Sequence, residues 1–258
     1  MVPDALPPPS LPRQPQPFTK VRFRFRKGAD LRLLSHHDLL RTFERLLRRA
    51  NLPVRQTQGF HPKPRLVFAL SLPLGVVGCE EVGELELTEP LPPDAVHVRL
   101  AAQAPPGIDI LSVAAVDPHR TAQVRTLTYR LAVPPERLPG LAEKVAAVLA
   151  APECWVERKR PPARRLDLRP ILSDLRLVPA SGGREAPDGT NQGAYAPRSP
   201  GVALEMELFL TPAGTARPDE VLGLLGLADL LTEGVVLERS RLELHEDTPQ
   251  QPPQGPPE

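Results

Sequence analysis

Three histidines and an acid are the side chains of this chain with the most evident capacity for chemistry. His36 and His37 directly precede Asp38, and His61 follows in the same segment. Histidine can transfer protons near neutral pH or bind a metal ion. Successive helical residues point about 100° apart, so His36 and His37 would need a third partner to share one ligand. We expect no metal site here, and we expect these side chains to cap the helix or to bond to a nearby loop.

RNA cleavage is an alternative use of the same histidines. One imidazole would deprotonate a 2′-hydroxyl, or protonate the leaving oxygen, without a metal ion. A metal-independent endoribonuclease or RNA-modifying enzyme that uses His36, His37 or His61 therefore stays open as an alternative function.

Positive charge is concentrated around these histidines. Residues 20–65 contain thirteen Lys or Arg and three Asp or Glu, whereas the formal net charge of the whole chain is +1. Such local concentration predicts an electrostatic footprint for a polyanion, most often nucleic acid. The alternative is an ordinary solvated surface.

The candidate nucleic-acid-binding residues belong to a strand, a helix and a loop. The strand contributes Arg22, Arg24 and Arg26, which alternate with apolar residues and so face away from the core. The helix contributes Arg41, Arg45, Arg48 and Arg49, and the Gly/Pro-rich loop contributes Phe60, His61, Lys63 and Arg65. Two alternatives stay open: Phe60 could plug the core, and Glu84 and Glu86 could neutralise the strand arginines.

The order of elements predicts an α+β fold made of two tandem ferredoxin-like (βαββαβ) domains with antiparallel sheets, rather than a single large sheet. We place the first domain at 20–117 and the second at 124–245, joined near 117–123. Strands are expected at 21–26, 66–72, 82–87, 108–116, 124–133, 154–160, 202–210 and 235–244, and a further strand is expected to end near 178. Helices are expected at 36–50, 92–102, 141–150 and 218–231.

Composition bounds the rest of the chain. Many of the 35 prolines fall in an arm at 1–19 and a tail at 246–258, which we expect to be disordered, and 180–201 reads as a flexible insertion. Cys79 and Cys154 are far apart and form no ligand spacing, so we expect no cofactor and a reducing, cytoplasmic location. No apolar run reaches the roughly 18 residues of a membrane span.

Three segments carry a resemblance to a known family. They are SHHDLLRTFERLLRRANLPVRQTQGFHPKPRLVFALSLPLGV at 35–76, RRLDLRPIL at 164–172 and RPDEVLGLL at 217–225. They resemble the radical-SAM-associated, or radical-SAM-linked, bacterial proteins of uncharacterised function. The resemblance implies partnership with a radical SAM enzyme. The chain has no CxxxCxxC motif of its own, so the cluster would belong to a separate chain.

We therefore expect a non-catalytic RNA-binding accessory protein that partners a radical SAM enzyme in RNA modification or processing. Besides the enzyme hypothesis above, a pure protein-interaction module remains open, with the basic face docking on an acidic surface of the partner.

Overall fold

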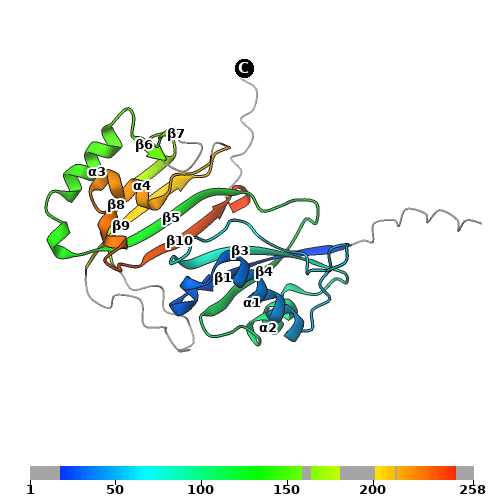
Figure 1. The fold of residues 1–258 in the computed structure, drawn as a ribbon. Helices are drawn as coiled ribbons and strands as arrows, with labels where there is room; N and C mark the ends of the chain where they lie inside the picture. The colour runs from blue at the N-terminus through cyan, green and yellow to red at the C-terminus, as the bar shows by residue number, and fades with distance from the viewer. Residues whose placement is uncertain (1–17, 159–163, 181–200, 213, 248–258) are drawn as a thin grey trace, which may run out of the picture.

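The computed structural model describes residues 18–158, 164–180, 201–212 and 214–247 (Figure 1). The strands are β1 Thr19–Lys27, β2 Leu66–Phe68, β3 Val77–Leu87, β4 Ile108–Val116, β5 Val124–Val133, β6 Trp155–Arg158, β7 Arg164–Asp167, β8 Leu172–Pro179, β9 Val202–Phe209 and β10 Leu237–Leu244. The α-helices are α1 His36–Arg49, α2 Pro93–Ala101, α3 Leu141–Ala150 and α4 Pro218–Leu225. The short 3-10 helices are η1 Ala29–Leu33, η2 Pro135–Arg137, η3 Ala228–Leu231 and η4 His245–Asp247.

The two halves of the chain share one mostly antiparallel sheet, so the expectation of separate sheets was wrong. Its strand order is β4-β1-β3-β10-β5-β9-β8, and β2 also pairs with β3. The join is short and parallel, because only Glu238 and Arg239 of β10 pair with Val77 and Gly78 of β3. The α+β class agrees with the sequence expectation.

Local sequence explains the elements that lead to the candidate site. In β1, Val21, Phe23 and Phe25 alternate with arginines and are buried. At the start of α1, the Ser35 side chain accepts a hydrogen bond from the backbone N–H of Asp38 at 3.2 Å. This N-cap satisfies one of the free N–H groups of the first turn, as the sequence predicted.

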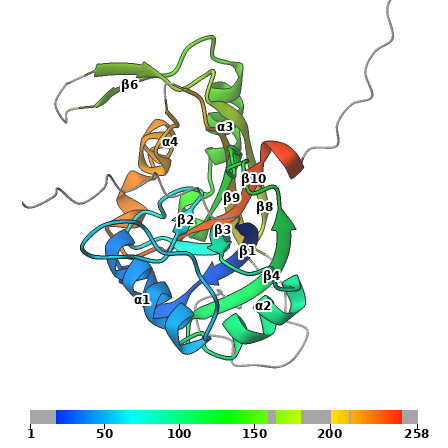
Figure 2. The same cartoon turned by 90° about the vertical axis from the view of Figure 1, so that its right-hand side faces the viewer.

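Each half of the sheet packs its own helices (Figures 1 and 2). Phe23, Phe25 and Leu85 of the sheet pack with Phe43 of α1 and Leu100 of α2 in one buried cluster. A second cluster joins β5, β9 and β10 to α3 and α4. The arginines of β1 consequently lie on the sheet face opposite α1.

A buried ion pair crosses the join between the halves. Arg239 of β10 and Glu81 of β3 are 1% and 4% exposed, and Nε of Arg239 donates to Oε1 of Glu81 at 2.8 Å. Arg239 also donates to the carbonyls of Leu70 and Ser71. This explains why β2 ends at Phe68 instead of reaching 72: β10 occupies the edge of β3, and the chain after β2 turns its carbonyls toward Arg239.

Several predicted boundaries were also wrong. The strand expected at 154–160 is present as β6, but it pairs with β7 in a separate two-stranded ribbon that was not predicted. The last helix stops at Leu225, because Gly226 adopts a left-handed conformation with φ of 71°. Residues at both supposed tails are ordered parts of the fold: Thr19 begins β1, and Glu246 and Asp247 belong to η4.

The remaining parts of the expected arm, insertion and tail, at 1–17, 181–200 and 248–258, lie outside the described residues. Across the described part of the chain, no helix has both the length and the apolarity needed to cross a membrane.

Candidate nucleic-acid interface

The arginines of β1 do not line an uncovered face, which corrects the sequence expectation. Arg22 lies opposite Glu84 in the β1–β3 register. Its Nη2 is 2.8 Å from Oε1 of Glu84, and its Nη1 is 3.0 Å from Oε2 of Glu246. The Arg22 side chain is only 10% exposed. Burial would lower its pKa, but the hydrogen bonds to Glu246 and Glu84 outweigh burial and raise the pKa. Arg22 therefore keeps its positive charge, and the two carboxylates balance that charge.

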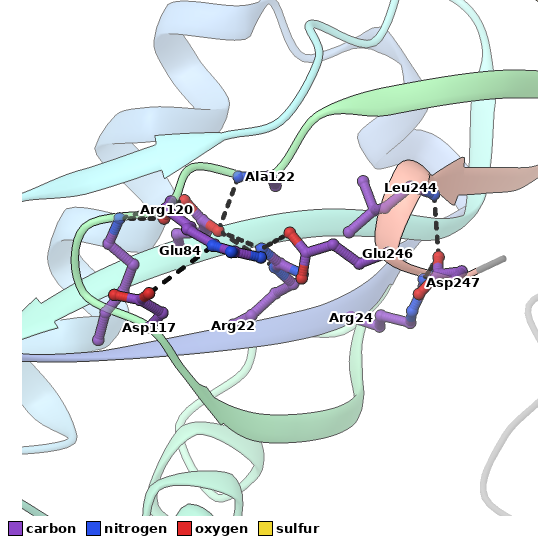
Figure 3. A network of polar contacts seen from close by, with 10 residues as sticks. Arg22, Arg24, Glu84, Asp117, Arg120, Ala122, Leu244, Glu246 and Asp247 are labelled. Carbon is purple, nitrogen blue, oxygen red and sulfur yellow. Dashed lines mark hydrogen bonds and ion pairs between the residues drawn. The ribbon is translucent and has the colours of Figure 1, made fainter. Parts of the chain in front are cut away.

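Two distant segments cover this face of β1 (Figure 3). The backbone N–H of Ala122, in the segment between the halves, donates to Oε1 of Glu84 at 3.0 Å. From η4, Asp247 binds Nη2 of Arg24 at 2.6 Å and also accepts the N–H of Leu244. Of the two carboxylates considered at the sequence level, Glu84 pairs with Arg22, whereas Glu86 pairs with Arg55 instead. Two further carboxylates come from the C-terminal turn.

Arg26 is the third β1 arginine and is also half-buried. Its Nε is buried and finds no hydrogen-bond partner among the described residues. Its charge acts on Glu238 and Cys79, which lie near it on β10 and β3. Arg22 and Arg24 are therefore paired with carboxylates, whereas Arg26 is half-buried and forms no ion pair with the described residues.

The outer face of α1 carries most of the remaining charge. Every residue of α1 that is exposed to solvent is a histidine or an arginine: His37, Arg41, Arg45, Arg48 and Arg49. We call these five residues the α1 basic stripe. His37, Arg41, Arg45 and Arg49 are spaced by four residues, and Arg48 follows Arg45 by three, so the five follow one side of the helix. Leu39, Phe43 and Leu46 face the core.

Neutralisation of the α1 basic stripe is slight. Arg41 makes an exposed pair with Asp38 at 3.3 Å, and Arg49 donates to the carbonyl of Gln103 at 2.8 Å. Within the described residues, no carboxylate pairs with Arg45 or Arg48. Unpaired guanidinium groups on one helix face leave a surface to which phosphate oxygens could bind.

The Gly/Pro loop is the tip of a β-like excursion, which we call hairpin 54–66. A bridge from Gln56 to Pro64 joins its two legs, and a bridge from Val54 to Leu87 attaches its base to β3. Closer to the tip, the N–H of Thr57 donates to the carbonyl of Lys63 at 2.8 Å, and the N–H of Lys63 donates to Oγ1 of Thr57 at 2.9 Å. The loop therefore has a defined shape, as its prolines suggested.

The tip of hairpin 54–66 presents an aromatic ring to water. Phe60 is fully exposed, which excludes the alternative that it plugs the core. Gly59 just before it has φ of 131°, a conformation open to glycine and costly for other residues. His61, Lys63 and Arg65 are exposed, and no carboxylate of the described residues pairs with them. A free ring among unpaired cations suits contact with a base and its phosphates.

The structure does not bring the three histidines together. The rings of His36 and His37 have centroids 5.9 Å apart, and that of His36 packs edge-on against Phe68 at 6.0 Å. No contact within the described residues joins His61 to either ring. No three His, Cys, Asp or Glu side chains in that part of the chain are placed to hold a metal ion.

The cysteines are unsuited to nucleophilic chemistry. Burial, followed by the nearby charge of Glu238, raises the pKa of Cys79 to about 12. Cys154 is 6% exposed, and burial raises its pKa as well. Thiols at neutral pH would therefore remain protonated, and only the thiolate attacks.

Sequence reasoning missed a second exposed group with cationic and aromatic character. The β6–β7 ribbon presents Trp155, 47% exposed, and places the Arg165 guanidinium 4.9 Å from the centre of its ring. The signal was in the sequence, because residues 158–165 hold five cations and no acid, and they begin three positions after the single tryptophan.

Comparison with known proteins shows a family and solved structures of low sequence identity. A family model described as "Uncharacterized protein conserved in bacteria (DUF2344)" matches residues 20–208. A crystal structure of an unknown protein from Galdieria sulphuraria aligns over 88% of this chain and 99% of its own, with 16% identity and a TM-score of 0.24. A search of curated proteins gives no match.

Proposed function

Because the chain belongs to the family of uncharacterized proteins conserved in bacteria (DUF2344), whose description names no activity, we propose a function from the geometry of the site. The protein binds RNA through the α1 basic stripe and hairpin 54–66, and it does not itself catalyse a reaction on that RNA.

The observation that carries this proposal is the composition of the α1 surface. All five exposed residues of the helix are histidine or arginine, and two of them, Arg45 and Arg48, face no carboxylate among the described residues. The β1 arginines provide the contrast, because the fold neutralises Arg22 and Arg24 with carboxylates from β3 and η4. A surface whose cations are left unpaired retains the field that attracts phosphates and exchanges counterions for them.

Hairpin 54–66 would extend the α1 basic stripe. Its first bridged residue, Val54, follows Arg49 by five positions, so the root of the hairpin lies within ~18 Å of Arg49 along the chain. Lys63 and Arg65 would neutralise phosphates near the helix, and Phe60 would stack on a base. Contacts from the helix side chains to the RNA phosphates would position the RNA, and the Phe60 ring would stack preferentially on an unpaired base.

Partnership with a radical SAM enzyme is the second part of the proposal. Its support is the resemblance of residues 35–76, 164–172 and 217–225 to radical-SAM-associated proteins. Cys79 and Cys154 are the only cysteines, so the chain cannot supply three cysteine ligands to an iron–sulfur cluster. The protein would present RNA to an enzyme on a separate chain, within RNA modification or processing.

We also interpret the single sheet as two ferredoxin-like units fused edge to edge. The four strands of the first half adjoin in the order β4-β1-β3-β2, and the four main-sheet strands of the second half adjoin in the order β10-β5-β9-β8. If strands are numbered within each half, both orders are 4-1-3-2. The β6–β7 ribbon is then an insertion in the second unit, between α3 and β8.

A salt series of filter-binding measurements with structured RNA tests the proposal. Each lost phosphate contact lowers the slope of log affinity against log salt by about one. Replacing Arg45, Arg48 and Arg49 by Ala should therefore flatten the slope by about three. Arg241→Ala is the matched control, because Arg241 is an exposed arginine of β10 that pairs with Glu243.

Two outcomes would contradict the proposal. Parent-like binding by the triple variant would exclude the α1 basic stripe as the site. Absence of RNA binding, together with nuclease-resistant co-purification of a partner enzyme, would favour a protein-interaction module.

A further inference from the structure

The β6–β7 ribbon is a separate structural unit, firmly attached at its base. It forms a two-stranded sheet of its own with Trp155 opposite Asp167 and Arg158 opposite Arg164. Figures 1 and 2 both place it at the end of the molecule opposite α1 and α2. A surface on this ribbon would therefore act independently of the α1 basic stripe.

Buried polar contacts fix the inner side of the ribbon. Arg158 is 11% exposed and binds Glu220 of α4 through Nε at 2.6 Å and Nη2 at 2.8 Å. At the other end of the ribbon, Oδ1 of Asp167 accepts the N–H groups of Cys154 at 2.7 Å and Arg169 at 3.0 Å. These bonds hold the strands against the second half of the protein, so the orientation of the outer side is set.

The outer side presents a flat cationic and aromatic pair. Nε1 of Trp155 donates to Glu153 at 2.7 Å, which fixes the indole, and the guanidinium of Arg165 lies over the ring at 4.9 Å. Glu157 is opposite Arg165 in the register but forms no ion pair with it. The indole is nevertheless 47% exposed. A Trp155–Arg165 contact that served only to stabilise the ribbon would not need so much of the indole ring to face water.

We propose that Trp155 and Arg165 bind an unpaired nucleotide of the RNA, as a second contact remote from α1. The indole stacks on the base, and Arg165, already held over the indole, meets the adjacent phosphate. This inference rests on the proposed function, since it takes RNA as the ligand. RNA is favoured over a protein partner because Arg165 keeps its charge unpaired and the sequence from 158 to 165 contains only basic and apolar residues. The proposed site consists of Trp155 and Arg165 alone.

The single tryptophan supplies a direct measurement. Full-length protein is titrated with single-stranded oligoribonucleotides and with a duplex of the same length, while tryptophan fluorescence and the anisotropy of labelled RNA are recorded in parallel. Single strands should quench Trp155 saturably, and the duplex should quench it far less. Quenching should persist in the Arg45→Ala/Arg48→Ala variant at saturating RNA, because the two contacts lie at opposite ends of the protein.

Substitutions separate stacking from charge. Trp155→Ala should weaken single-strand binding roughly 5- to 100-fold, the range expected for the loss of one stacked base. Trp155→Phe should retain most of the affinity. Arg165→Lys should bind less well than the parent, because lysine keeps the charge but loses the planar group. Arg241→Ala again serves as the control, and thermal unfolding of each variant establishes that it is folded.

The results distinguish this inference from the proposed function. Tight RNA binding with unchanged tryptophan fluorescence and a parent-like Trp155→Ala variant would overturn the ribbon site and leave the α1 proposal standing. Absence of any RNA binding by anisotropy would overturn both. Fluorescence that responds to a purified partner enzyme but not to RNA would assign the ribbon to protein docking and reject the nucleotide site.

Discussion

Arg22 and Glu84 face one another across β1 and β3, with Nη2 2.8 Å from Oε1 and both side chains largely buried. Glu84 also lies 3.8 Å from Nζ of Lys20 and accepts the N–H of Ala122. Removing this carboxylate would leave two buried cations short of a partner. We expect Glu84→Ala to lower the free energy of unfolding by about 3 to 5 kcal/mol, as measured by urea titration.

Arg41→Ala is the control for this stability measurement. Arg41 belongs to an exposed pair whose side chain is 70% accessible, so its loss should change the free energy of unfolding by less than about 1 kcal/mol. If Glu84→Ala were as stable as the parent protein, the β1 arginines could not be described as neutralised within the fold.

Glu205 and Glu238 offer a second test, because both lie opposite Arg130 in the sheet yet shift in opposite directions. For Glu205, burial would raise the pKa, but hydrogen bonds from Arg176 and Arg130 outweigh it and hold the pKa below 4.5. For Glu238, burial dominates and raises the pKa above 4.5 despite the charges of Arg26 and Arg130.

The signs of the two effects follow by linkage. Glu205 contributes stability above pH 4.5 that is lost as the pH falls through its lowered pKa. Glu238 favours the folded state below pH 4.5, and that contribution is lost as the pH rises through its raised pKa. At neutral pH we therefore expect Glu205→Gln to lower the melting temperature and Glu238→Gln to raise it. Both differences should shrink near pH 4, and melting temperatures that shift in the same direction at neutral pH would contradict the assignment.

The sequence predicted what depends on local pattern. Alternation in β1 and the Ser35 cap of α1 are set by neighbouring residues, and both were found. The ion pairing of Arg22 and Arg24 depends on Glu246 and Asp247, which are more than 200 positions away in the sequence. No local periodicity predicts that these residues meet. The same holds for the single sheet, since its join consists of the two pairs between β10 and β3, together with the buried pair of Arg239 and Glu81.

The site was partly predictable for the same reason. Helical spacing alone places the arginines of α1 on the outer face, and the Gly/Pro loop did prove to have a fixed shape. A strand was expected at 154–160, but its pairing with β7 was not, because both strands are only four residues long and pair with each other rather than with the main sheet.

The histidines allow a test of the enzyme hypothesis. His37 and His61 are exposed, His36 packs on Phe68, and no contact in the described residues assembles the three. Concerted acid–base catalysis needs two accessible groups within reach of one scissile bond, and His36, whose ring is 5.9 Å from that of His37, is partly covered by Phe68. We therefore expect purified protein to leave total RNA intact on a denaturing gel. Cleavage that disappears in His36→Ala, His37→Ala or His61→Ala would instead establish an endoribonuclease.

The exposed ring of hairpin 54–66 allows function to be separated from stability. Phe60 is fully exposed and makes no core contact, so Phe60→Ala should change the free energy of unfolding by no more than about 0.5 kcal/mol. If the ring stacks on a base, the same change should weaken binding to RNA with an unpaired loop by about 1 to 3 kcal/mol. Binding to a fully paired duplex should change little, and Phe60→Tyr should behave like the parent because tyrosine also stacks. Equal binding of the looped RNA by Phe60→Ala and the parent would remove the hairpin from the interface and leave the α1 basic stripe to act alone.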